Sequence, residues 1–117
     1  MNWQHIDDEE CRRFSAAAEL VGKRWNAGIL LAIARGAARF TEIIAAVAGL
    51  SDRLLAQRLK ELEHAGLIER HVIATMPVQV RYRPTERGLD LMRSLQPLVE
   101  YGLRWREVDE AARPAAS

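Results

Sequence analysis

The sequence predicts a mainly α-helical domain with one small β-hairpin, an α+β arrangement. Two changes of pattern predict it. Up to residue 66 the apolar residues recur every three or four positions, which is the spacing of a helix face. Over residues 67–84 they alternate with polar residues, which is typical of half-buried strands, and "TMP" at residues 75–77 supplies a turn. The helical spacing then returns and continues to residue 105.

Capping residues and glycines divide the N-terminal half into four expected helices, over residues 7–21, 24–36, 42–47 and 51–66. Thr41 is the candidate N-cap of the third helix, and Ser51 that of the fourth. Gly66 stands where a helix often ends in the left-handed conformation. The last helix is expected to begin after Thr85.

The fourth expected helix has two distinct sides. One side carries the leucine seam Leu55, Leu59 and Leu62. Polar side chains lie off this seam, namely Arg53, Gln57, Arg58 and Lys60. The pattern indicates a helix anchored to a core by leucines that presents arginine and glutamine to solvent or to a partner.

Composition limits the classes of protein. The 117 residues suffice for one domain, expected over residues 1–110, with residues 111–117 as a disordered tail. The net charge is only +1, but residues 11–106 hold 16 basic and 9 acidic side chains, a net +7. A basic body of this kind is typical of a protein that binds a polyanion.

Several function classes lack support in the sequence. There is no glycine-rich phosphate loop, no nucleophile spaced with a base, and no metal-ligand pattern, so we expect no catalysis, metal or cofactor. No apolar run approaches the length of a membrane helix, and the acidic start does not resemble a signal peptide. A lone cysteine forms no internal disulfide, which fits a reducing cytoplasm.

Two helices joined by a turn and followed by a two-stranded hairpin form a winged helix-turn-helix. In that fold the fourth helix is the recognition helix, which lies in the major groove of double-stranded DNA. Arginine and glutamine have the donor sets needed at guanine and adenine edges, and arginines on the wing reach the minor groove or the backbone. The candidate DNA-binding residues are Arg39, Ser51, Arg53, Gln57, Arg58, Lys60, Arg81 and Arg83.

One such helix offers too few contacts for specific DNA binding, so we expect a homodimer. Flanking N- and C-terminal helices would form the dimer, with the apolar positions of the last helix as its seam. These positions are Leu89, Met92, Leu95, Leu98, Val99, Leu103 and Trp105. A two-fold dimer predicts a palindromic operator whose half-sites lie about 34 Å apart.

Residues 11–104 resemble the HxlR family of bacterial transcriptional regulators, relatives of the MarR type. The resemblance depends on Cys11 ahead of "GKRW" (22–25), then "RFTEI" (39–43), "GLSDRLLAQRLKELEHAGLIER" (49–70) and "VRYRPTERG" (80–88), in that order. It implies a homodimeric DNA-binding regulator, often a repressor of a neighbouring operon that a chemical signal releases. Arg12 stands where the family usually has a proline, and Pro84 where a leucine is common.

The resemblance also implies a redox or electrophile-sensing role for Cys11, whereas a lone cysteine is by default a small buried hydrophobe. The start of a helix and the neighbouring Arg12 and Arg13 would favour the reactive thiolate. A second possibility is a small-molecule effector in a groove between the subunits. An alternative of another class is a winged helix used only for protein–protein dimerisation.

Overall fold

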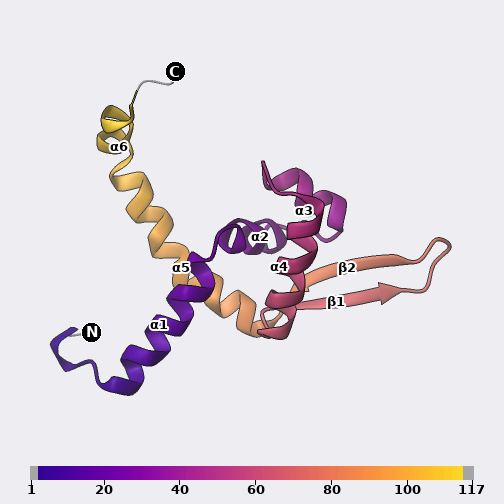
Figure 1. The fold of residues 1–117 in the computed structure, drawn as a ribbon, viewed down its shortest axis with the longest axis horizontal. Helices are drawn as coiled ribbons and strands as arrows, with labels where there is room; N and C mark the ends of the chain where they lie inside the picture. The colour runs from indigo at the N-terminus through magenta and orange to yellow at the C-terminus, as the bar shows by residue number, and fades with distance from the viewer. Residues whose placement is uncertain (1–2, 115–117) are drawn as a thin grey trace.

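The computed structural model describes residues 3–114 and confirms the predicted order of helices and hairpin (Figure 1). A 3-10 turn at Trp3–His5 precedes the first helix. The elements that follow are α1 (Asp8–Gly22), α2 (Asn26–Ala34), α3 (Phe40–Ala46), α4 (Asp52–His64), β1 (Ile68–Ile73), β2 (Gln79–Pro84), α5 (Glu86–Arg104) and α6 (Arg106–Ala112). No helix of this part of the chain is long and apolar enough to cross a membrane.

A single apolar core joins α2, α3, α4 and the start of the hairpin. Its buried members are Ile29, Leu30, Ile33, Ile43, Leu50, Leu55, Leu59, Leu62, Leu67 and Ile68. The three leucines predicted to anchor the fourth helix are all among them, each at most 1% exposed. Since burying a leucine is worth about 1.5–3 kcal/mol, this seam holds α4 firmly on the core.

The hairpin leaves the core as an antiparallel pair in which Glu69 lies opposite Arg83 and His71 opposite Arg81. Opposed residues share a face of the pair, so these four side chains lie on one side. The backbone N–H of Tyr82 also donates to the carbonyl of Ala38 at 2.7 Å, which attaches β2 to the segment before α3. The wing therefore has a fixed base beside α3.

Side-chain caps begin three of the helices. The side chains of Asp7, Ser51 and Thr85 accept the backbone N–H groups that begin α1, α4 and α5, which confirms these predicted starts. Gly66 has a φ of +78°, which confirms the left-handed residue expected after α4. Thr85, between β2 and α5, is also bonded to the segment that follows α4. Its Oγ1 donates to the carbonyl of Gly66 at 2.6 Å, and its backbone N–H donates to the carbonyl of Leu67 at 3.0 Å.

The start of the third helix differs from the prediction. The third helix begins at Phe40, so Thr41 is not its N-cap. Instead the Glu42 carboxylate accepts the N–H groups of Ala38 and Arg39, at 3.2 and 2.8 Å, and these bonds start the helix two residues earlier.

The C-terminal segment contains a helix that the prediction missed. The chain bends at Trp105 and continues as α6, so residues 111 and 112 of the expected tail are helical. The acidic first turn of α6, with Glu107 and Asp109, was the available sequence signal. Residues 115–117 lie outside the described residues.

Helices α1 and α5–α6 project away from the core (Figure 1). The radius of gyration is 17.0 Å, against about 13 Å for a compact domain of this length. Every residue from 96 to 114 is exposed. A single copy therefore leaves these helices with much of their apolar surface in solvent.

Candidate nucleic-acid interface

The exposed face of α4 carries a polar set opposite its leucine seam. At 100° per residue, Arg53, Gln57 and Lys60 fall within about 60° of one another and point away from the seam. All three are exposed. Their positions agree with the prediction that this face is available to a partner.

Ser51 has a structural task as well as its predicted place near DNA. Its hydroxyl oxygen accepts the N–H of Leu54 at 3.2 Å and caps α4. A cap orders the first turn, and the positive end of the helix dipole is then held at the surface.

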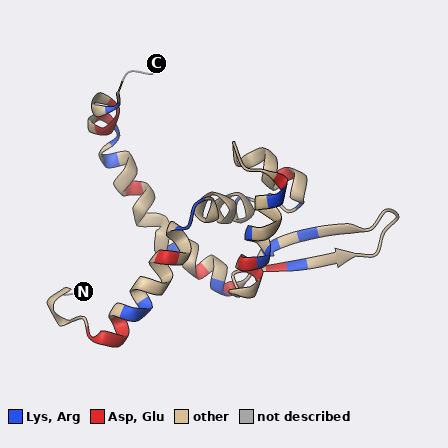
Figure 2. Cartoon of the chain, in the orientation of Figure 1, with Lys and Arg blue, Asp and Glu red and all other residues tan. Residues whose placement is uncertain are grey.

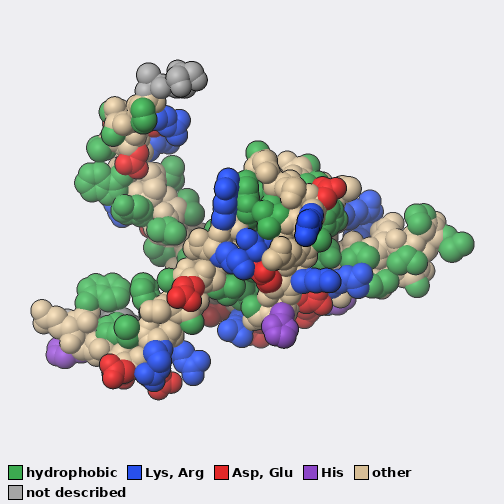
Figure 3. All heavy atoms as spheres, in the orientation of Figure 1, with side chains coloured by type: hydrophobic (Ala, Val, Ile, Leu, Met, Phe, Trp, Pro, Cys, Tyr) green, Lys and Arg blue, Asp and Glu red, His purple; other side chains and the backbone are tan. Residues whose placement is uncertain are grey.

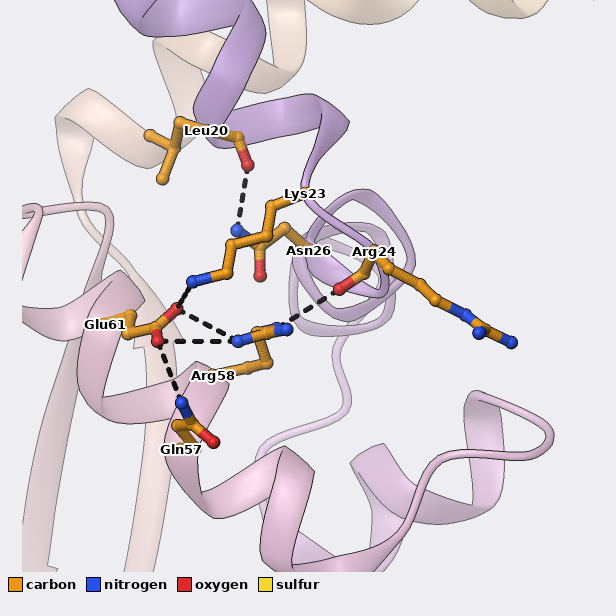
Figure 4. A network of polar contacts seen from close by, with 7 residues as sticks. All are labelled: Leu20, Lys23, Arg24, Asn26, Gln57, Arg58 and Glu61. Carbon is orange, nitrogen blue, oxygen red and sulfur yellow. Dashed lines mark hydrogen bonds and ion pairs between the residues drawn. The ribbon is translucent and has the colours of Figure 1, made fainter.

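Arg58 is not free to meet DNA as the sequence suggested. Its side chain is only 11% exposed, and its Nε donates to the carbonyl of Arg24 at 3.2 Å, between α1 and α2 (Figure 4). Its Nη1 donates to the Glu61 carboxylate at 3.3 Å. The structure therefore assigns Arg58 to an internal network and not to the exposed set.

Glu61 is the centre of this network (Figure 4). It accepts from Lys23 Nζ at 2.9 Å and from Gln57 Nε2 at 3.4 Å, besides Arg58. The Lys23 hydrogen bond is the largest cause that holds the pKa of Glu61 below its ordinary 4.5. The sequence contained a partial signal, since Gln57 and Glu61 have the four-residue spacing of helix neighbours, but Lys23 lies 38 positions away.

Two arginines converge on Gln79, the first residue of β2. The Nη2 atoms of Arg39 and Arg81 both donate to the Gln79 amide oxygen at 3.4 Å, although Arg39 belongs to the start of α3. Gln79 was missing from the predicted site, because only the packing of β2 against the start of α3 brings it beside Arg39. The backbone hydrogen bond from Arg39 is the largest cause that lowers the pKa of Glu42 nearby.

Arg83 is the more strongly paired of the two arginines of β2. Its Nε donates to the Glu69 carboxylate at 3.1 Å, and His71 Nε2 lies 2.9 Å from the same oxygen. These two bonds, that of His71 first, lower the pKa of Glu69. The pairing offsets part of the positive charge of Arg83, whereas the Arg81 guanidinium donates to a neutral amide at 3.4 Å.

Basic and acidic residues are interspersed along α4, whereas the two strands of the hairpin carry more basic than acidic residues. Lys and Arg residues occur along α4 and in both strands of the hairpin with acidic residues among them, and a separate acidic cluster lies at the start of α1 (Figure 2). In the space-filling view basic side chains cover the middle of the visible face (Figure 3). Residues 52–84 hold six basic and four acidic side chains, a small positive excess of the sign expected of a surface that meets phosphates.

The projecting helices carry the predicted dimerisation residues. Leu89, Leu98, Val99, Leu103 and Trp105 are 41–59% exposed. Met92 and Leu95 are half-buried, and Met92 packs against the core. A groove of about 640 Å³ lies between α2 and α5, lined mainly by apolar side chains that include Leu31, Leu89, Met92, Leu95, Leu98 and Val99.

Cys11 lies on the exposed surface of α1. In a single copy of the chain it is therefore not the small buried hydrophobe that a lone cysteine would be by default. Its neighbour Arg13 is 3.6 Å from Glu9, an exposed pair on the same helix. Among residues 3–114 no group of three or more His, Cys, Asp or Glu side chains is placed to hold a metal ion.

A leucine-anchored helix with an exposed polar face, beside a basic hairpin, defines a winged helix-turn-helix DNA-binding protein. Comparison with known protein families agrees with this class of protein. The chain belongs to the HxlR-like helix-turn-helix family, whose model matches residues 20–110.

Relatives and solved structures place it among transcriptional regulators. It is 40% identical to the uncharacterised HTH-type regulator YvaP of Bacillus subtilis, over 83% of this chain and 90% of that one. It is also 40% identical to the regulator YodB of Bacillus subtilis, over 75% and 79%.

The crystal structure of diamide-treated YodB matches with a TM-score of 0.71 and 37% identity, over 81% of this chain and 94% of that one. The redox regulator HypR in its reduced form matches with a TM-score of 0.77 and 27% identity, over 85% and 98%. The fold of this chain is thus that of known regulators of this family.

Proposed function

We propose that this chain is a homodimeric, sequence-specific DNA-binding transcriptional repressor of the cytoplasm, and that Cys11 receives an oxidant or electrophile signal. Regulation by a non-covalent ligand is the alternative form of that signal. The observation that carries the proposal is the exposed face of α4, where Arg53, Gln57 and Lys60 lie together on a helix that the core holds rigidly.

The interface divides into reading and positioning parts. Arg53 and Gln57 have side chains that match base edges in the major groove. Lys60, together with Arg39 and Arg81 around Gln79, supplies cations for phosphates. Ser51 and Arg83 are secondary candidates, since one is a helix cap and the other is paired with Glu69.

A second copy of the chain is the proposed occupant of the apolar groove between α2 and α5. The exposed Leu98, Val99 and Leu103 continue the strip that lines this groove, and exposed apolar patches of this extent are typical of an interface. A dimer would bury the projecting helices, which accounts for the extended shape of one copy. It would also present two copies of α4 to half-sites about 34 Å apart.

The signalling part is supported by the exposed position of Cys11 and by the relatives. Diamide, used to treat YodB, is a thiol oxidant, and HypR is described as a redox regulator. A thiol on the surface of a projecting helix is open to such reagents.

Fluorescence anisotropy with two labelled duplexes tests the function. One is the duplex that the protein selects from a randomised library, and the other is a random duplex of the same length. We expect the wild type to prefer the selected duplex, and Arg53→Ala or Gln57→Ala to weaken that binding by about 1–3 kcal/mol per subunit.

Arg81→Ala serves as the contrasting variant. It should weaken binding to both duplexes and reduce the dependence on salt by about one unit of slope per lost phosphate contact. A stable dimer that shows no preference for any duplex would refute DNA reading and favour the protein–protein dimerisation module.

A further inference from the structure

The junction between α1 and α2 is bonded directly to the recognition helix. The junction is short, and Trp25, its last residue, has a left-handed φ of +82°. Lys23 Nζ lies 2.9 Å from Glu61 Oε2, and the Arg24 carbonyl accepts from Arg58 Nε at 3.2 Å (Figure 4). Two bonds therefore run from this junction to the same turn of α4.

These bonds add directionality that the leucine seam lacks. Apolar packing resists separation of α4 from the core, but it is non-directional and tolerates small rotations and tilts. Charge-assisted hydrogen bonds are short and directional. A pair of them at one edge of α4 sets the rotation of that helix about its own axis.

The same network reaches the reading face. The Glu61 carboxylate accepts from Arg58 and, through Oε1, from Gln57 Nε2 at 3.4 Å. Gln57 is one of the side chains proposed to meet bases. The end of α1 and a DNA-reading side chain thus share one carboxylate.

We propose that Glu61 is a positioning residue for DNA reading, and that Lys23 and Arg58 act through it to fix the orientation of α4 and of Gln57 relative to α1. The inference depends on the DNA-binding function proposed above. It assigns Glu61 no contact with DNA. It also provides a route by which a displacement of α1, the helix that carries Cys11, reaches the recognition helix.

If Glu61 acts only through its charge, its loss should raise the affinity for DNA, and if it positions α4, its loss should lower the affinity for the selected duplex. A carboxylate on the recognition helix repels phosphates, so charge alone predicts that Glu61→Gln strengthens binding to any DNA. Positioning predicts that the variant weakens binding only to the selected duplex. Glu63→Gln is the matched control, because it removes the same charge from an exposed position of the same helix.

The experiment measures Kd for wild type, Glu61→Gln and Glu63→Gln on the selected and random duplexes, at several salt concentrations. We expect Glu61→Gln to bind the selected duplex about tenfold more weakly, the equivalent of one charge-assisted hydrogen bond. Its affinity for the random duplex should stay the same or rise, and its salt slope should not fall. Glu63→Gln should lose no preference for the selected duplex.

Lys23→Met gives a second test that keeps the fold intact, because Lys23 is a partly exposed surface residue. It should weaken binding to the selected duplex with an unchanged salt slope. The double variant Lys23→Met/Glu61→Gln should be no worse than the worse single variant, since both remove the same link. Circular dichroism at the assay temperature checks that each variant is folded.

Two results would overturn the inference while leaving the DNA-binding function standing. One is unchanged or tighter binding of Glu61→Gln to the selected duplex. The other is an equal loss on both duplexes, which indicates a general effect on the fold or on charge. A wild type without preference for any duplex would overturn the function itself, and the inference with it.

Discussion

Replacing Gly88 by alanine adds one methyl group where α5 passes over the start of β1. Gly88 is buried, and a β-carbon built there would overlap the carbonyl oxygen of Leu67 and lie 3.0 Å from its carbonyl carbon. The obstacle is backbone that is already bonded to Thr85, so no flexible side chain can move aside. Helix α5 must shift away from β1.

The magnitude follows from what this shift disturbs. Overpacking a tight site costs about 1–3 kcal/mol. The shift also weakens the two bonds from Thr85 to the carbonyls of Gly66 and Leu67, each worth about 0.5–1.5 kcal/mol net. Alanine regains about 1 kcal/mol through its better helix propensity. We therefore expect Gly88→Ala to lower the free energy of unfolding by about 3 kcal/mol.

Urea unfolding followed by circular dichroism measures this free energy of unfolding. All variants are compared at the same protomer concentration, because the stability of a dimer depends on that concentration. Gly102→Ala is the control in the same helix. Apart from its chain neighbours and the nearby backbone of its own helix, no atom of the described part of the chain lies within 4 Å of its added β-carbon, so it should stabilise α5 by up to about 1 kcal/mol. If Gly88→Ala unfolds within about 0.5 kcal/mol of wild type, the steric reasoning is wrong.

Three further predictions concern the dimer, the thiol and pH. Leu98→Glu places a charge in the apolar groove and should give a monomer in light scattering at micromolar concentration, with specific DNA binding lost. Diamide should lower the operator affinity of the wild type but not of Cys11→Ser, as anisotropy before and after treatment would show; equal loss in both would exclude Cys11. The pKa of Glu42 is lowered, so its contribution to stability is complete above its ordinary 4.5 and disappears as pH falls through the lower folded value. Glu42→Gln should therefore reduce the loss of stability between neutral pH and about pH 3 in urea titrations.

Much of the fold was predictable because it depends on local pattern. The change from helical to alternating spacing located the hairpin, and Ser51, Gly66 and Thr85 bounded α4 and α5 as expected. The start of α3 was misplaced, because the prediction took Thr41 as the N-cap. In the structure the Glu42 carboxylate accepts the N–H of Arg39, and the helix begins at Phe40. Helix α6 was missed, because its few apolar residues give no clear period.

The candidate site also contains residues that the sequence placed correctly and residues that only the fold placed. Helical spacing alone was enough to set Arg53, Gln57 and Lys60 opposite the leucines, since residues on one helix keep fixed angles. Arg58 has the same chemistry as Arg53, but at 100° per residue it lies about 40° from Leu62 and about 100° from Gln57, at the edge of the leucine seam. Spacing therefore separates it from the exposed set, and the fold supplies its partner there, the Arg24 carbonyl.

The sequence by itself thus determined the class of fold, the recognition helix and the basic character of the surface, because periodicity and charge are carried by the chain. Only the tertiary structure decided which polar residues are free. Lys23 meets Glu61, and Arg39 meets Gln79, across separations of 38 and 40 residues. Such pairs arise from the packing of helices against the hairpin, and no local rule relates one partner to the other.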